Sequence, residues 1–275
     1  MFVYRSNRLE ELVDCLSQVV SQPLPHILAP EIILIQSAGM ERYLSREVAR
    51  RVGVLAGARF PFPRAFIRDI FNQALGADQT GDPFERQSMS WLLFSELKKV
   101  TGMPGFEALS AHLKDDVDSS RRLLLAERFA YLFDQYITYR PDMILEWSDV
   151  SSNQSMQAQL WQRICALVPI PNFAERSKRF LKELSNDELA RVLPARISVF
   201  GGPGLPPLYL QILQRMGQVV PVHMFALTVC KHYFFDTTSL GRASSQENSQ
   251  HAHPLLASMG QVGGDFQYLL EGLGG

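Results

Sequence analysis

Side chains that can form specific hydrogen bonds cluster on one side of a predicted helix over residues 120–140. At about 100° per residue, the residues on that side are Tyr131, Asp134, Gln135 and Thr138. The opposite side carries the residues that a core requires, namely Leu125, Phe129, Leu132, Phe133 and Tyr136. One side should therefore pack, while the other is available to bind something. A solvated polar side is the alternative, and it is the commoner property of amphipathic helices.

The ends of this helix are predicted from the residues that flank it. Ser119 or Ser120 can accept hydrogen bonds from the unpaired N–H groups of the first turn. Pro141 disfavours helical geometry at Arg140, so the helix should stop there. The acidic residues just before the helix are expected to lie on a solvated loop; they are Asp115, Asp116 and Asp118.

The first segment has the order of strand, turn and helix that phosphate-binding folds use. Residues 2–4 suit a short strand and residues 8–20 an amphipathic helix, and Arg5-Ser6-Asn7-Arg8 joins them. A nucleotide-binding turn needs glycines, whose N–H groups can approach phosphates, and a lysine followed by serine or threonine. This turn has neither, which argues against ATP chemistry here.

Arginines are concentrated in residues 42–68. The seven are Arg42, Arg46, Arg50, Arg51, Arg59, Arg64 and Arg68. The net charge of −1 excludes a protein that coats nucleic acid through its overall field. A local patch could still contact phosphates, and a solvated helix face near a subunit interface is the alternative.

Cysteine and histidine spacing gives little support for a disulfide or metal site. The cysteines are odd in number and far apart, as expected of reduced, packed thiols; they are Cys15, Cys165 and Cys230. Two spaced pairs could in principle bind a metal, but single pairs rarely do; these are His251 with His253 and Cys230 with His232.

Composition predicts a soluble globular protein. The chain has 275 residues, 46% hydrophobic and 20% charged, which is enough for a large core in one or two domains. No run approaches the roughly 18 uninterrupted apolar residues of a membrane helix, and the first residues do not resemble a signal peptide. We therefore expect a cytoplasmic protein without membrane contact.

The order of predicted elements indicates an α/β fold interrupted by helices. An apolar run at residues 31–36 suits a buried parallel strand, and strands return at residues 196–200 and 219–226. The stretch between them has only helical patterns, predicted at residues 65–75, 87–101, 105–115, 120–140, 154–167 and 173–184. We predict a parallel-sheet domain from residues 1–75 plus 190–275, with residues 76–189 inserted as an all-α subdomain.

Three shorter segments complete the layout. Phe60 and Phe62 lie in an extended segment beside prolines, where their rings could stack on bases or, more commonly, fill the core. Residues 236–253 are rich in small polar residues and are predicted to form a flexible loop. A last helix is predicted at residues 254–270.

Several strings of residues resemble, in the same order, the gamma-subunit family of exodeoxyribonuclease V, the RecC chains of RecBCD helicase–nucleases. The longest is Leu-Phe-Asp-Gln-Tyr-Ile-Thr-Tyr-Arg-Pro at residues 132–141, and the others lie at residues 4–9, 33–40, 60–63, 87–91, 205–211 and 254–260. The resemblance spans nearly all of the chain. Because chains of this family are much longer, we expect an N-terminal fragment or a shortened homologue.

The resemblance implies a helicase-like, P-loop-type sheet domain that is inactive. In a working helicase the strand ending near Phe200 would carry an Asp-Glu pair for magnesium, whereas this chain has Gly201-Gly202. The family's subunit is part of an ATP-dependent nuclease for double-strand break repair and homologous recombination. This chain would itself lack ATPase and nuclease sites and need no cofactor, because ATP and Mg²⁺ would be used by partner subunits.

The resemblance also implies partners and site residues. The partners would be the motor–nuclease beta subunit, the helicase alpha subunit, and single- and double-stranded DNA. Family members help split the duplex and inspect the emerging strand for a recombination signal. Positions matching the inspecting residues are Leu132, Asp134, Gln135 and Arg140. Other residue types are expected in the family at the positions of Phe62, Arg68, Tyr131 and Phe173.

The expected DNA-binding set has suitable chemistry; it is Leu132, Asp134, Gln135, Arg140, Phe62, Arg68, Tyr131 and Thr138. A carboxylate accepts from base amino groups, an amide donates and accepts, arginine contacts guanine or phosphate, and an aromatic ring stacks. Two alternatives stay open. One is a scaffold that clamps the motor subunit without touching DNA, and the other is a standalone nucleotide hydrolase, which would need a phosphate loop or carboxylate cluster.

Overall fold

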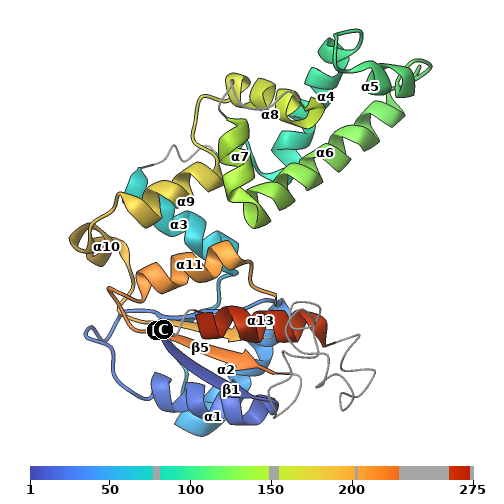
Figure 1. Cartoon of the computed structure of the whole chain (residues 1–275). Helices are drawn as coiled ribbons and strands as arrows, with labels where there is room; N and C mark the ends of the chain where they lie inside the picture. The colour runs from blue at the N-terminus through green and yellow to red at the C-terminus, as the bar shows by residue number, and fades with distance from the viewer. Residues whose placement is uncertain (77–80, 149–154, 202–203, 229–259, 273–275) are drawn as a thin grey trace, which may run out of the picture. The chain divides into compact units, whose positions relative to one another are not determined.

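The computed structural model describes residues 1–76, 81–148, 155–201, 204–228 and 260–272. They form two compact units, one from Met1–Ala74 with Leu184–Gly275 and one from Leu75–Glu183 (Figure 1). We call these the α/β unit and the helical unit. Several predictions concern residues outside the described ones, namely the loop at 236–253, Gly202, Cys230, His232, His251 and His253.

The strands described in the α/β unit form one parallel sheet. They are β1 (Phe2–Ser6), β2 (Glu31–Leu34), β3 (Ala58–Arg59), β4 (Ile197–Gly201) and β5 (Val222–Leu227). Their order in space is β1-β5-β4-β2-β3, and every neighbouring pair is parallel. Val199, for example, lies opposite Leu34 on one side and Met224 on the other. The predicted α/β class with a parallel sheet is confirmed, and the sheet joins strands from both ends of the sequence.

Helices cover both faces of this sheet. The helices of the α/β unit are α1 (Leu9–Val20), α2 (Ala38–Val52), α3 (Pro63–Leu75), α10 (Asn186–Val192), α11 (Pro207–Met216) and α13 (Gln261–Gly272). Figure 1 shows α1 and α2 on one face and α11 on the other. The apolar side of α1, including Leu12 and Leu16, shares a buried cluster with Ile33, Phe200 and Phe225 of the sheet region. Burial on both faces explains why β2 and β4 are apolar runs rather than alternating ones.

The helical unit surrounds a buried aromatic core. Its helices are α4 (Arg86–Val100), α5 (Glu107–His112), α6 (Ser120–Tyr139), α7 (Pro141–Trp147), α8 (Met156–Leu167) and α9 (Phe173–Lys182). The ring of Phe133 on α6 meets Trp161 on α8 edge-on at 5.3 Å, and both side chains are fully buried. Helices α4, α7 and α9 all pack against α6. The longest helix is therefore enclosed by three others.

Both ends of α6 differ in detail from expectation. Ser119 is the N-cap residue but has φ 62°, and its side chain makes no capping bond. Instead, the Asp116 carboxylate accepts from the N–H groups of Arg121 and Arg122, because an ionised acceptor suits the positive end of a helix. The solvated acidic loop was therefore a wrong prediction for Asp116. At the other end α6 does stop before Pro141, but that proline opens α7 as its first residue.

Among the described residues, no helix combines the length and the apolar character needed to cross a membrane.

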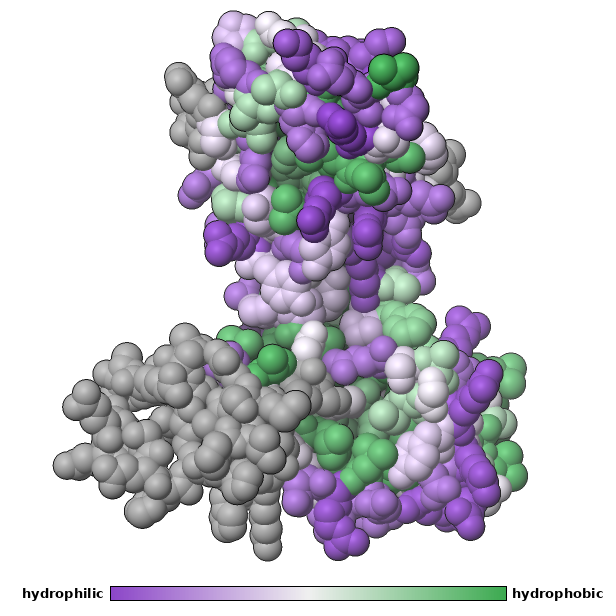
Figure 2. Space-filling model, turned by 90° about the vertical axis from the view of Figure 1, so that its right-hand side faces the viewer, coloured by the Kyte–Doolittle hydropathy of each residue, from purple (hydrophilic) through white to green (hydrophobic). Residues whose placement is uncertain are grey.

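The surface of both units carries hydrophilic and hydrophobic residues side by side (Figure 2). On the face that Figure 2 presents, a patch of hydrophobic residues on the helical unit is bordered by hydrophilic ones.

Candidate nucleic-acid interface

Five residues on the exposed side of α6 form a row along the helix; they are Leu124, Arg128, Tyr131, Gln135 and Tyr139, spaced by three or four residues as neighbours on a helix surface must be. The acidic residue Glu127 is also exposed on α6, beside this row. Tyr131 retains 45% of its surface, whereas Gln135 is half-buried. We call these five residues the α6 stripe. It combines rings that can stack, an amide that donates and accepts, and a guanidinium.

Two of the predicted site residues lie in this stripe, and two flank it. Tyr131 and Gln135 are one helical turn apart on the same side. Leu132 and Asp134 are half-buried and lie on either side of the stripe, because each is offset from it by part of a turn. Arg140 is exposed at the junction between α6 and α7, where its N–H donates to the Tyr136 carbonyl at 2.8 Å. The polar side is therefore narrower than the sequence suggested.

Thr138 is not on the exposed side, so its predicted place on a recognition face is wrong. Only 6% of the residue is exposed, and its hydroxyl donates to the Asp134 carbonyl at 2.9 Å. The helical period of α6 alone could not reveal this. With α4, α7 and α9 packed around it, the buried side of α6 is wider than the single apolar stripe seen in the sequence.

A residue that sequence reasoning missed supports the stripe from a second helix. The guanidinium carbon of Arg86, at the start of α4, lies 5.3 Å from the centroid of the Tyr131 ring. This cation–π distance fixes the side of the ring that faces α4. No local sequence signal could have found the contact, because 45 residues separate the two partners in the chain and only the packing of α4 on α6 joins them.

Phe62 and Arg68 belong to the α/β unit, whereas the other six predicted site residues belong to the helical unit. Phe62 is exposed just before α3, and Arg68 is half-buried within α3. Phe60 instead packs against the core, as the commoner alternative predicted. Only the ring of Phe62 is therefore exposed and able to stack on a base. Phe173, at the start of α9, is buried.

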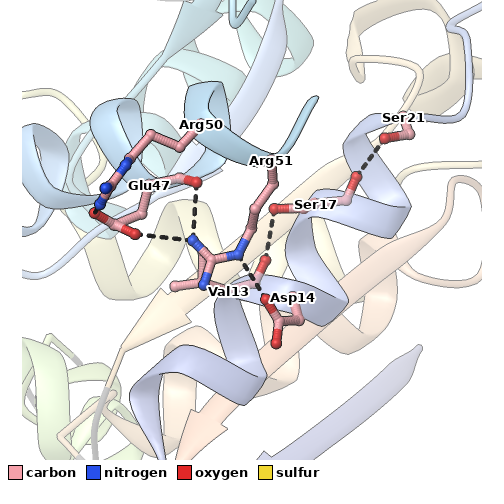
Figure 3. Close-up of polar contacts among 7 residues, drawn as sticks. All are labelled: Val13, Asp14, Ser17, Ser21, Glu47, Arg50 and Arg51. Atoms are coloured by element: carbon pink, nitrogen blue, oxygen red, sulfur yellow. Dashed lines mark hydrogen bonds and ion pairs between the residues drawn. The ribbon is translucent and has the colours of Figure 1, made fainter. Parts of the chain in front are cut away.

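The predicted arginine patch is partly used for internal contacts. In Figure 3, Arg51 of α2 bridges to Asp14 of α1 at 2.6 Å and to Glu47 at 2.9 Å, and Arg50 also binds Glu47 at 3.0 Å. Hydrogen bonds from Arg51 and then Arg50 hold the pKa of Glu47 below its usual value. Arg42 and Arg46 are exposed on α2. The contacts of Arg51 therefore join α1 to α2.

Polar groups at the β1–α1 turn bond to one another. The Ser6 hydroxyl donates to the Glu11 carboxylate at 2.6 Å and accepts from the Arg8 N–H at 3.0 Å. The Arg8 guanidinium lies 3.3 Å from the same carboxylate. Glu11 is in the first turn of α1, the position at which a helix N-terminus favours an anion. The chain's own carboxylate therefore supplies the negative charge there.

Metal chemistry has little support from the described part of the chain. No group of three or more His, Cys, Asp or Glu side chains in those ranges could hold a metal ion. Burial raises the pKa of the Cys165 thiol to about 12, so this cysteine is an inert packed thiol. Cys15 is half-buried and also free.

Comparison with known proteins then places the chain in a family. It matches the family model described as RecC, N-terminal domain, over residues 1–274. The chain belongs to this family. The resemblance found in residues 132–141 and the other strings is thereby confirmed.

Relatives of known function carry the name RecBCD enzyme subunit RecC. The chain is 31% identical to that of Escherichia coli over 314 aligned residues, which cover 98% of this chain and 28% of the relative. It is 29% identical to that of Haemophilus influenzae and 28% identical to that of Mycolicibacterium smegmatis, covering 30% and 25% of those proteins. The chain thus spans less than a third of the length of these relatives.

Proposed function

We propose that this chain is the N-terminal part of a DNA-binding, non-catalytic subunit of a RecBCD-type helicase–nuclease. Its partners would be the motor–nuclease beta subunit, the helicase alpha subunit, and single- and double-stranded DNA, in the cytoplasm. The family match, and relatives that are subunits of the RecBCD enzyme, support this proposal. The chain's role would be to help split the duplex and inspect the emerging strand for a recombination signal.

The observation that carries the proposal is the chemistry of the α6 stripe. Tyr131 offers a ring that Arg86 holds on one side, and Gln135 offers an amide one turn away. Asp134 and Leu132 flank the stripe, and Arg140 follows it. Unstacked bases are bound by proteins through stacking and through hydrogen bonds to their edges, so this arrangement suits a single strand laid along α6.

We also propose that the α/β unit has a helicase-like, P-loop-type fold that has lost its ATPase. The first support is the β1–α1 turn, where Glu11 occupies the anion position and would repel a phosphate. The second is the end of β4, where a Cβ at Gly201 would lie 3.2 Å from the Gln36 side chain. An acidic side chain at this position would therefore require the end of the Gln36 side chain to shift. ATP and Mg²⁺ would then be used by the partner subunits.

Nucleotide binding by the chain tests the loss of the ATPase. Equilibrium dialysis with ATP and Mg²⁺ should detect no saturable binding, and the Glu11→Gln variant, which removes the charge but keeps the turn, should behave the same way. Saturable binding that disappears in an Arg8→Ala variant would contradict the proposal.

Crosslinking tests the DNA contact separately. A photoreactive base is placed at successive positions of a single strand bound by the reconstituted complex. The crosslinked peptide should contain Tyr131 and Gln135 when the base lies within the recombination signal. Crosslinks that reach the subunit only through peptides of the α/β unit would contradict the assignment of the stripe.

A scaffold that clamps the motor subunit without DNA contact is the second candidate, and one observation favours it. Ile27 and Leu28, in the segment before β2, are 99% and 92% exposed, which is unusual for large apolar side chains. If this segment docks a partner subunit, Ile27→Ser with Leu28→Ser should weaken assembly of the complex. In that case DNA binding by the assembled fraction would be unchanged.

A further inference from the structure

Helix α4, which packs against α6, carries an exposed tryptophan. Gln87, Trp91, Phe94 and Lys98 are spaced by three or four residues and therefore share one side of α4. We call these four residues the α4 face. Trp91 is 60% exposed, in contrast to Trp147 and Trp161, which are buried. A large ring left in water on a regular helix suggests a surface that binds something.

The rings of this face are held in place by a cation from α6. Trp91 and Phe94 form a T-shaped contact with their centroids 6.0 Å apart. The guanidinium carbon of Arg122 lies 4.2 Å from the centroid of Phe94, and its Nη2 donates to the Ser119 hydroxyl at 2.9 Å. The indole is therefore oriented without being stacked on Phe94, while a positive charge is fixed one ring away.

Cations lie on and beside this face. Lys98 is exposed on the same side as Trp91, two turns along the helix. The one carboxylate within α4, Glu96, is buried on another side and paired with Lys99 at 2.5 Å and Arg163 at 3.0 Å. Two carboxylates flank the face: Asp116 accepts from the backbone N–H of Arg122, and Glu85 precedes α4. The exposed ring with Lys98 beside it complements a ligand with flat bases and a negative backbone.

We propose that the α4 face is a sequence-independent stacking site for single-stranded nucleic acid, in which a base stacks on Trp91 while Lys98 and Arg122 contact phosphates. Proteins that hold single strands combine these two elements, because every base has a flat face and every nucleotide has a charge. Tryptophan and arginine are also common in protein–protein interfaces, so loss of subunit assembly is one outcome of the test below. This site would add affinity for the strand, not discrimination between bases.

Tryptophan emission gives a direct measurement in the 275-residue chain. Titration with an oligothymidylate of about 12 nucleotides should quench the emission, because a base stacks on the exposed indole. Trp91→Phe should abolish the quench and keep most of the affinity. Trp91→Ala should weaken binding about 5- to 150-fold, the equivalent of one stacked base. Thermal unfolding followed by circular dichroism should be unchanged, because the residue is exposed.

Salt dependence tests the phosphate contacts. Lys98→Ala should reduce the slope of log affinity against log salt by about 0.7, the value for one phosphate of a single strand. Lys182→Ala, which removes an exposed lysine of α9, is the matched control and should leave the slope unchanged. Unchanged affinity in Trp91→Ala overturns the proposal. So does a variant that binds the oligonucleotide normally but no longer assembles with partner subunits, since the face would then bind protein.

The α4 face and the α6 stripe are separate proposals, and different variants test them. If Gln135→Ala leaves the response to the signal intact while Trp91→Ala loses affinity, the proposed role of the stripe fails and the α4 site remains. If Gln135→Ala loses the response to the signal while Trp91→Ala keeps its affinity, the α6 stripe is supported and the α4 site is contradicted.

Discussion

The β1–α1 turn and the α6 stripe both carry side chains suited to binding, but they differ in where those side chains are directed. At the turn, Ser6, Arg8 and Glu11 bond to one another within six residues of chain. On α6, Tyr131 and Gln135 lie a turn apart on the side of the helix that faces away from the core. Polar residues that can close a local network stabilise the fold, whereas polar residues spread at the helical period remain able to bind a partner.

Polar residues that bond to one another inside the fold should lower its stability most when one partner is removed. In the α/β unit, Arg196 and Glu31 form a buried pair, with Nε to Oε1 at 3.0 Å, and Arg196 also donates to the Gln22 carbonyl at 3.2 Å. Arg196→Met would leave the Glu31 carboxylate buried without its cation. We expect the free energy of unfolding in urea to fall by about 3–5 kcal/mol.

A double variant is the control for this effect. Glu31→Leu combined with Arg196→Met removes both charges, so most of the lost stability should return. If the single variant is as stable as the unchanged protein, the pair does not stabilise the fold. The claim that internally paired polar residues serve stability would then be contradicted.

Thr138 sharpens the comparison within α6 itself. Its hydroxyl bonds to the helix backbone and its methyl group is buried, so we expect Thr138→Ala to cost about 1 kcal/mol of unfolding free energy. Thr138→Val keeps the shape of the side chain and loses only the hydrogen bond to the Asp134 carbonyl, so it should cost no more stability than Thr138→Ala. Neither variant should change the response of the complex to its recombination signal. If a Thr138 variant has normal stability but the complex carrying it no longer responds to the signal, Thr138 takes part in recognition after all.

The elements that follow local rules could be predicted from the sequence. The apolar run at β2, the stop of α6 before Pro141, and a sheet built from both ends of the chain all needed only patterns along the chain. The position of β5 between β1 and β4 could not be predicted in this way, because pairing partners are distant in sequence. Pro141 was predicted only to end a helix, although proline is also common as the first residue of one, as it is in α7.

The candidate site was predictable only in part, for a related reason. The period of α6 placed Tyr131 and Gln135 correctly on the exposed side, but it could not register the three helices that bury Thr138. Trp91 belongs to a string that resembles the family, but the sequence did not show that its ring is exposed, and the contact of Arg86 with Tyr131 depends on the packing of α4 on α6. Whether residues 76–189 fold as an independent subdomain stays a prediction, as does DNA contact by each site residue.

Among these substitutions, Gln135→Ala should have the smallest effect on stability. It is also the most direct test of function. As a half-buried residue of the stripe, Gln135→Ala should change the free energy of unfolding by less than about 0.5 kcal/mol. Gln18→Ala removes an exposed glutamine from α1, outside the stripe and outside the predicted set, and is the matched control.

The deciding measurement is signal-dependent degradation of DNA by the reconstituted complex carrying Gln135→Ala or Asp134→Ala. If these side chains contact bases, each variant should lose about 1–3 kcal/mol of discrimination at one position of the signal. Affinity for DNA without the signal should stay nearly unchanged. A normal signal response from both variants would contradict the account and leave α6 as an ordinary packed helix with a solvated side.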